Sequence, residues 1–482
     1  MQIIKLSVKY KLLVLTYIIS WLPINLYTQV SWIYYSDSPV LSMDTTSNMW
    51  GAYGQPSCIF HQDTFKMWYA VSEGVDQFDP IAKGRIHYAW SLDGIVWNKY
   101  NSNPVIDVGG AGQWDGQWLD TPEILWDGTE YKLYYYGDST YDQGQSNTAI
   151  GLAISQDGIN WTKQGKVLQR GALGDWDGKF IESPAAYYDT SSGLYALLYT
   201  GIDTVGFGKI GLTVSSDGYN WIKYPTNPVF SVGNFPAWND IAVGVPALIE
   251  TNGVFEMWFC GVSNQDQYDS ARVGYAVSQN GVDWIEYPGN PVLYADLGKS
   301  ASFWAIDVVW DNSANEYKLY YEDFMLYGNP SDPDTVNAIY RASAPRNVLF
   351  SDQCALNAGN DTIIFPGDTI QLSANGGIFY QWDPPTGLSN PSISDPLAYP
   401  DSTTTYTLLS VSDSCITLDT ITISVDSLVY IRNEKNSEIF DIFPNPVNES
   451  FYVNYPIYVE KNAVLEILDI SGRVLFVYGI ME

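Results

Sequence analysis

Acidic residues recur at one position of a repeated strand motif, two residues before the proline of the strand. In the last unit Val309 stands at the place of the proline, so Asp307 is aligned with this position. The position therefore holds Gly54, Asp120, Glu182, Gly244 and Asp307. If these strands converge on one axis, the acids point into a common space, where like charges push pKa values apart. A protonated acid beside a carboxylate is the pair that cleavage of a glycosidic bond needs. The alternative is that these carboxylates only cap loops or hold a cation.

A repeat of about 60 residues must position these acids. Each full unit carries a Ser-x-Asp-Gly or Ser-x-Asn-Gly turn followed by Trp, as in SSDGYNWIKYPTNPVF of residues 215–230. The aligned tryptophans lie 60 to 65 residues apart and are Trp32, Trp97, Trp161, Trp221 and Trp284. The Asp side chain bonds the backbone N–H groups of such a turn and Gly supplies a positive φ, so we interpret the turn as structural. A fixed period of this length indicates an array or a ring of small sheets.

Each unit contains four runs that are typical of β-strands, rich in Tyr, Ile, Leu and Val and separated by turns. The last unit, which ends near Pro345, lacks its fourth strand, and the half-unit of residues 32–41 can supply one. The sequence therefore predicts an all-β fold, with a five-bladed β-propeller over residues 32–345. The N-terminal strand would close the ring and cover an otherwise open edge.

Six tryptophans near the starts of the units could stack on sugar rings. Three of them, Trp114, Trp176 and Trp238, share one repeat position eight residues before the proline, which indicates a structural role. The less regular ones are the candidate sugar platforms, and they are Trp50, Trp118 and Trp304. An aromatic side chain offers an apolar ring to a partner, but packing within the fold stays open for each of these three.

The composition excludes several classes of partner. The 482 residues carry a net charge of −31, which argues against nucleic acid and anionic membranes as partners. An acidic surface keeps an exported protein in solution and could also hold Ca²⁺; no other cofactor is expected. The two histidines, His61 and His87, do not build a zinc pattern or a Ser-His-Asp set, and there is no phosphate-binding GxxxxGK run.

Residues 1–28 are typical of a secretory signal. Lys5, Lys9 and Lys11 precede the apolar run LLVLTYIISWL, which is too short and too interrupted for a membrane span. We therefore expect an exported protein without a transmembrane segment.

The phrases WDG-x-x-x-E-S-P, GLYALLYTG and IGLTVSSDGYNW resemble uncharacterised secreted members of the arabinanase, levansucrase and invertase superfamily. This superfamily includes glycoside hydrolase families 43 and 32, and the resemblance covers residues 32–345. It implies that Glu182 in IESP is the general acid and that Asp120 in LDTP tunes this acid and orients the sugar. It also implies a third carboxylate at the start of blade 1, which acts as base or nucleophile.

The sequence departs from this family at the third carboxylate. The blade-1 stretch is WGAYGQPSC, with Gly54 where the family has Asp, and the substitutes are Asp44 and Asp307. The first hypothesis is a secreted hydrolase of a plant or algal polysaccharide. The second is a non-catalytic carbohydrate-binding or adhesive propeller at the cell surface, and a purely structural surface protein is the third.

Two further modules follow the propeller. Residues 350–427, with PGDTIQLSANGG, YQWDPPTGLSNP and TTTYTL, resemble the immunoglobulin-like or PKD-like β-sandwiches of large secreted Bacteroidetes proteins. Cys354 and Cys415 flank this module and could pair in an oxidising compartment. Residues 437–482, with IFDIFPNPVNESFYV and LEILDISGRVLF, resemble the C-terminal sorting domain of type IX secretion, in a shortened form. This resemblance implies secretion and attachment machinery as partners, and a location outside the cell or on its outer surface.

Overall fold

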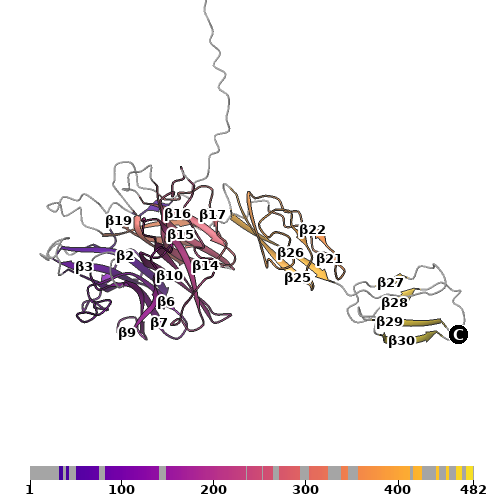
Figure 1. Ribbon diagram of the computed structural model, residues 1–482, viewed down its shortest axis with the longest axis horizontal. Helices are drawn as coiled ribbons and strands as arrows, with labels where there is room; N and C mark the ends of the chain where they lie inside the picture. The colour runs from indigo at the N-terminus through magenta and orange to yellow at the C-terminus, as the bar shows by residue number, and fades with distance from the viewer. Residues whose placement is uncertain are drawn as a thin grey trace, which may run out of the picture.

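The computed structural model describes most of the chain between Trp32 and Val425. The described residues are 32–35, 39–42, 50–74, 82–140, 148–234, 236–251, 253–263, 271–293, 303–323, 338–345, 356–412 and 416–425, and four strands between 441 and 480 are described as backbone. All elements in these ranges are β-strands, which confirms the predicted all-β fold (Figure 1). The predicted signal of residues 1–28 lies outside the described residues, as do Asp44, Cys354 and Cys415.

The strands up to Pro345 lie in two eight-stranded sheets and one four-stranded sheet. Each eight-stranded sheet consists of two antiparallel groups joined by a single parallel bridge, so that five groups follow one another. Group 1 contains β2 (Trp50–His61), β3 (Thr64–Gly74), β4 (Lys83–Ser91) and β5 (Asn98–Lys99). Group 2 contains β6 (Trp118–Trp126), β7 (Tyr131–Asp138), β8 (Ala149–Ser155) and β9 (Thr162–Gln169). Group 3 contains β10 (Phe180–Asp189), β11 (Leu194–Ile202), β12 (Gly208–Ser215) and β13 (Ile222–Lys223). Group 4 contains β14 (Ala242–Thr251), β15 (Val254–Val262), β16 (Arg272–Ser278) and β17 (Ile285–Glu286).

Group 5 is completed by the N-terminal part of the chain. It contains β18 (Phe303–Asp311), β19 (Glu316–Asp323) and β20 (Ala338–Pro345), and its outer strand is β1 (Ile33–Tyr34). Ile33 pairs with Ser343, and Trp32 is buried with its ring centroid 6.5 Å from that of Trp258 in group 4. The stretch that begins at Trp32 therefore covers the edge of β20, where the sequence places it.

The first strands of the groups form a ring. Each of β2, β6, β10 and β14 contacts the first strand of the next group, and β18 contacts β2. Single parallel bridges, Gly84 with Trp118 and Gly208 with Ala242, also join groups 1 to 2 and 3 to 4. The part of the chain up to Pro345 is thus a propeller-like ring of sheets, with the first strands innermost.

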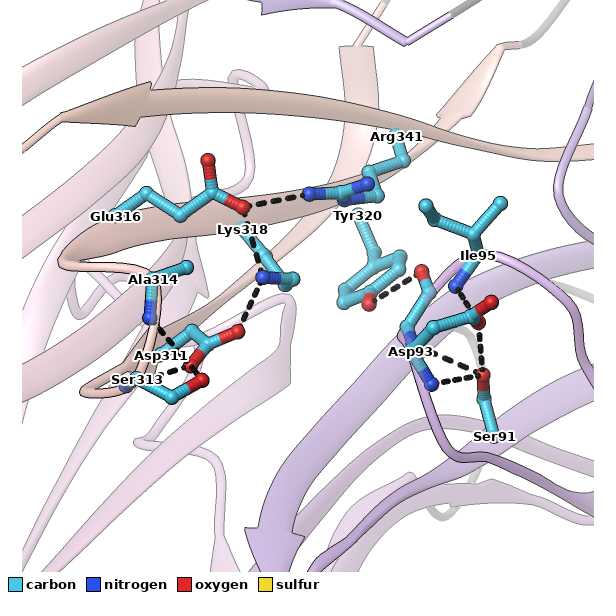
Figure 2. A network of polar contacts seen from close by, with 11 residues as sticks. Ser91, Asp93, Ile95, Asp311, Ser313, Ala314, Glu316, Lys318, Tyr320 and Arg341 are labelled. Carbon is cyan, nitrogen blue, oxygen red and sulfur yellow. Dashed lines mark hydrogen bonds and ion pairs between the residues drawn. The ribbon is translucent and has the colours of Figure 1, made fainter.

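The Ser-x-Asp-Gly turns tie neighbouring groups together. In the turn after β4, Ser91 Oγ accepts a hydrogen bond of 2.9 Å from the Gly94 N–H, and Asp93 Oδ1 accepts one of 2.8 Å from the Ile95 N–H. Figure 2 shows Tyr320 of group 5 beside this turn, where its hydroxyl donates to the Gly94 carbonyl at 2.9 Å. Equivalent bonds join Trp68 Nε1 to the Gly158 carbonyl and the Tyr134 hydroxyl to the Gly218 carbonyl. The interpretation of the turn as structural is confirmed.

The regularly spaced tryptophans are also structural. The ring of Trp114 lies where a Cβ on Gly137 or Gly151 would sit, so these glycines leave the room that the indole fills. Trp176 and Trp238 cover equivalent glycine pairs in groups 3 and 4. Cys58 and Cys260 are buried free thiols within their strands.

Residues 356–425 form a second body with its own core. Its strands are β21 (Thr362–Ile364), β22 (Ile370–Gln371), β23 (Phe379–Asp383), β24 (Leu397–Ala398), β25 (Thr404–Val411) and β26 (Ile416–Val425). They pair as a sheet in the order β21-β26-β25-β23 and as the ladder β22-β24, around buried Trp382 and Tyr406. Gln381 accepts a bond of 2.9 Å from the Gln279 N–H of group 4 and donates one of 2.9 Å to the Asp283 carbonyl.

Two antiparallel pairs lie near the C-terminus, β27 (Asp441–Phe443) with β28 (Tyr452–Asn454) and β29 (Ala463–Leu468) with β30 (Val474–Ile480). In the described parts of the chain, no helix is long and apolar enough to cross a membrane.

Candidate functional site

The first strands of the ring share a β-bulge. In group 2 the bulge falls between Asp120 and Glu123, so that two residues of β6 oppose one residue of β7. Groups 1, 3 and 4 have their bulges directly after Gly54, Glu182 and Gly244. The first bulged residue has a positive φ in each of these four strands: Gln55 (54°), Thr121 (39°), Ser183 (48°) and Val245 (50°). Such backbone is uncommon for residues other than glycine and is concentrated at functional sites.

The bulges surround one pocket at the centre of the ring. The pocket encloses about 300 Å³, part of it open to solvent. Its lining comes from all five groups: Gln55, Pro56, Thr121, Pro122, Glu123, Ser183, Pro184, Val245, Pro246, Ala305 and Ile306. Asp120 and Glu182 each directly precede a lining residue, and the charge of Asp120 acts on Glu182, so the two acids lie near each other beside this pocket.

Asp120 is held by two hydrogen bonds. Trp118 Nε1 donates to Oδ2 at 3.1 Å, and the Thr121 N–H donates to Oδ1 at 3.0 Å. Both bonds favour the ionised carboxylate and lower the pKa, but burial is the larger effect and raises the pKa of Asp120 to about 6.

Glu182 is the more basic member of the pair. Burial raises the pKa of Glu182 to about 7, and the negative charge of Asp120 adds to the increase. Between pH 6 and 7 the arrangement favours an ionised Asp120 beside a protonated Glu182. The roles of Glu182 as acid and Asp120 as its neighbouring carboxylate stay a prediction.

Tyr136 is a neighbour of this pair that the sequence analysis does not identify. It lies opposite Asp120 on β7, and its hydroxyl donates to Asp138 Oδ2 at 3.2 Å. Burial raises the pKa of Tyr136, and the charges of Asp138, Glu182 and Asp120 raise it further. No motif marks this residue, because the sequence YKLYYYG contains three tyrosines in a row and only the strand register distinguishes them.

The strand register does not support the alignment of Asp307 with Asp120 and Glu182. The bulge of β18 lies between Phe303 and Ile306, so Phe303 holds the position of the two acids and Asp307 comes four residues later. Asp307 Oδ2 accepts a hydrogen bond from the Cys58 N–H, and Oδ1 accepts one of 2.8 Å from the Val308 N–H. In the structure Asp307 is therefore a link between groups 5 and 1, and its predicted role as base remains a prediction.

Glu123 is an acid beside the pocket that the sequence analysis does not select. It lines the pocket and joins three groups: Oε1 accepts a bond of 2.8 Å from the Ala186 N–H, and Oε2 accepts one of 3.0 Å from the Ser57 hydroxyl. Burial and the nearby charge of Asp307 raise the pKa of Glu123 well above its usual value. Because backbone and hydroxyl donors engage both of its oxygens, we interpret Glu123 as a structural link below the pocket.

The place of the missing group-1 acid is occupied from another strand. A Cβ on Gly54 would overlap the carboxylate of Glu322, which belongs to β19 and is 6% exposed. No sequence motif surrounds Glu322, so its proximity to Gly54 is visible only in the folded chain.

The three candidate sugar platforms differ in what the structure describes. The Trp118 indole bonds Asp120 and lies where a Cβ on Gly84 would sit. Trp50 and Trp304 lie at the starts of β2 and β18, but their side chains are outside the described part of the chain. Among the described residues, no group of three or more acidic, His or Cys side chains is placed to hold a metal ion.

Part of the sequence is similar to two known proteins. No protein-family model matches the chain. Two proteins of Mycobacterium tuberculosis, Rv1502 of strain H37Rv and MT1551 of strain CDC 1551, are each 28% identical over 182 residues, or 37% of this chain. The chain spans about half the length, 54%, of these uncharacterised relatives.

Solved structures resemble the chain in fold. The complex of BT0996 with RGII has a TM-score of 0.53 at 17% identity, covering 66% of this protein and 93% of the solved one. A second structure belongs to the family 130 mannoside phosphorylases. It has a TM-score of 0.50 at 15% identity, covering 64% of this protein and 93% of the solved one. That family contains glycoside hydrolases that target β-1,2-mannosidic linkages in Candida mannan. β-1,2-Mannobiose phosphorylase of Listeria innocua also has a TM-score of 0.50, at 12% identity over 65% and 97% of the two proteins. The fold of this chain is therefore similar to that of glycoside hydrolases and glycoside phosphorylases.

Proposed function

We propose that this chain is a glycoside hydrolase that cleaves a polysaccharide or oligosaccharide in the centre of a five-bladed β-propeller. The observation that carries the proposal is the pair Asp120 and Glu182, with pKa values of about 6 and 7, next to a pocket lined by bulges from five strand groups. The similarity in fold to glycoside hydrolases and phosphorylases supports it.

The pair divides the chemistry between its two members. Glu182, protonated near pH 6.5, donates its proton to the leaving glycosidic oxygen as the C–O bond breaks. Asp120 is ionised at that pH, keeps the pKa of Glu182 high and binds sugar hydroxyls, with Trp118 fixing one of its oxygens. A water molecule supplies the oxygen that bonds to the anomeric carbon.

Gly54 supports a second candidate, a carbohydrate-binding or adhesive propeller without catalysis. In this alternative the pocket binds a glycan and the acids bond its hydroxyls, but the carboxylate that would activate water is missing from β2. The two candidates differ in one outcome, because only the hydrolase forms products from a sugar that it binds.

The same proposal includes export. In it, residues 1–28 act as a secretion signal, residues 350–427 form an Ig-like or PKD-like module with a Cys354–Cys415 disulfide, and residues 437–482 act as a type IX sorting domain. The motifs quoted for each segment support these assignments. Mass spectrometry of the protein recovered from the cell surface and medium tests the export, because a secretory signal is removed from the mature protein and residues 1–28 should then be missing.

The function is tested with the purified chain and a panel of arabinan, xylan, fructan, mannan and β-1,2-mannobiose, with and without inorganic phosphate. Hydrolysis releases free sugars in both conditions, whereas a phosphorylase needs phosphate and forms a sugar phosphate. Glu182→Gln should abolish turnover and leave the thermal unfolding curve of the protein unchanged. Binding of a glycan without any product would favour the second candidate, and full turnover by Glu182→Gln would reject the assignment of the acid.

A further inference from the structure

We propose that Glu322 of β19 supplies the third carboxylate of the site and acts as the base that activates water. The inference rests on the hydrolytic function proposed above, and it names a residue at a place where neither the repeat nor the family resemblance predicts one. In this view the acid missing at Gly54 has not been lost from the site. It has moved to the neighbouring strand group.

The strand register defines the space that the third carboxylate should fill. Gly54, Asp120 and Glu182 each precede the bulge of their own strand directly, so they hold equivalent positions in groups 1, 2 and 3. In groups 2 and 3 the side chain of the strand's own acid begins there. In group 1 the carbon and both oxygens of the Glu322 carboxylate lie where the first side-chain atom of residue 54 would be. An acid at the level of Asp120 and Glu182 is therefore present in group 1, delivered by β19.

The glycine at position 54 is explained by this arrangement. Gly54 does not have a positive φ, so its backbone conformation is one that any residue can adopt. A Cβ at position 54 would overlap the Glu322 carboxylate, so this side-chain end would have to move for any larger residue. Glycine at position 54 thus leaves the room in which the Glu322 carboxylate lies.

A comparison with group 4 separates this case from ordinary packing. Gly244 is the equivalent glycine there, and its free space is taken by Thr200 of the preceding group. The Thr200 hydroxyl accepts a bond of 2.8 Å from the Val245 N–H, so it supports the bulge backbone. A neutral hydroxyl is sufficient for that purpose. In group 1 the same space holds a carboxylate, which unlike a hydroxyl can take a proton from water as a general base.

The proposed step balances as follows. Glu182 gives its proton to the glycosidic oxygen as the bond from this oxygen to the anomeric carbon breaks. The oxygen of a water molecule bonds to the anomeric carbon and loses a proton to the Glu322 carboxylate. Exchange of protons with solvent then returns Glu182 to its acid form and Glu322 to its carboxylate form, so that the net reaction consumes one water molecule.

The first experiment compares Glu322→Gln with Glu182→Gln on a glycan that the unmodified protein hydrolyses. We expect Glu322→Gln to lower kcat by roughly 100-fold or more, the range for loss of a general base, with KM changed by only a few-fold. Glu256→Gln serves as the matched control, since it removes a fully buried carboxylate of β15 that accepts hydrogen bonds from the Tyr275 and Tyr317 hydroxyls and does not fill the space beside Gly54. That variant should keep its kcat within about twofold wherever it is folded.

The second experiment moves the carboxylate back to β2. Glu322→Ala empties the space beside position 54, and adding Gly54→Asp places an acid there from the other strand. We expect the double variant to recover at least about tenfold of the kcat lost in Glu322→Ala. The pair Gly54→Ala with Glu322→Ala fills the same space without a charge and should recover nothing. Gly54→Asp alone should be impaired, because its side chain meets the resident carboxylate.

The outcomes separate this inference from the proposed function. Loss of activity in Glu182→Gln together with full activity in Glu322→Gln would overturn the role of Glu322 and leave the hydrolase proposal standing. Full activity in both variants would reject the hydrolase mechanism itself. If Glu322→Gln does not fold, the double variant decides: a folded protein with recovered turnover supports the role, and a folded protein without it refutes the role.

Discussion

The electrostatic coupling of Asp120 and Glu182 predicts a narrow optimum of activity near pH 6.5. Protonation of Asp120 forms the acidic limb of the profile and loss of the proton of Glu182 forms the basic limb, at pKa values of about 6 and 7. With these two values, about 60% of the enzyme carries the productive protonation state at pH 6.5, and about 10% carries it at pH 5 or pH 8. The value of kcat/KM should therefore fall roughly sixfold on either side of the optimum.

Asp120→Asn tests the coupling directly, since it removes the charge and keeps the shape of the side chain. Of the two causes that raise the pKa of Glu182 from 4.5 to about 7, burial is the larger and the charge of Asp120 the smaller. Removing the charge should lower this pKa by at most about one unit, to roughly 6. Activity at pH 8 would then fall from about 15% of the maximum in the unmodified protein to about 1% of the maximum in the variant.

The assay is a pH profile of kcat/KM on a natural oligosaccharide, whose leaving group depends on protonation by Glu182. The basic limb of Asp120→Asn should move to lower pH, and the part of the acidic limb that belongs to Asp120 should disappear. Asp401→Asn removes an exposed carboxylate between β24 and β25 and should leave both limbs in place. A basic limb that stays at its original pH in Asp120→Asn, or moves upward, would refute the reasoning that the charge of Asp120 acts on Glu182.

Three further variants test the supports of the site and the fold. Trp118→Phe removes the indole N–H that bonds Asp120, so the pKa of Asp120 should rise and the acidic limb of the pH profile should move upward; an unmoved limb would contradict this role. Tyr320→Phe removes the bond to the Gly94 carbonyl and should lower the free energy of unfolding by about 1–2 kcal/mol in chemical denaturation, with kcat unchanged. Gln381→Ala removes two hydrogen bonds to group 4, so the second body should unfold at a lower temperature than the ring in calorimetry. A single unchanged transition would show that the apolar contacts of Leu409, Val411 and Ile416 with the ring are enough to couple the two bodies.

The sequence by itself determined the repeat and the all-β fold, and it selected Asp120 and Glu182 as candidate acids. Strand-forming runs, Asp-Gly turns and a fixed period are local properties of the sequence, and they can be recognised because each unit repeats the same pattern. Asp120 and Glu182 could be selected as candidates for the same reason, since both stand two residues before a proline in a recognisable strand, and their roles stay a prediction.

The tertiary structure decided what depends on register and on contacts between groups. With Val309 aligned to the proline, Asp307 matched Asp120 and Glu182, but the bulge of β18 places Phe303 at their position and Asp307 four residues later. A bulge in a strand without proline leaves no sequence signal. Glu322 could not be predicted from the sequence. Its carboxylate fills the space beside Gly54 across the junction of groups 5 and 1, although the two residues are 268 positions apart in the chain. A glycine in a sequence shows that a side chain is missing, and only the folded chain shows which other side chain takes its place.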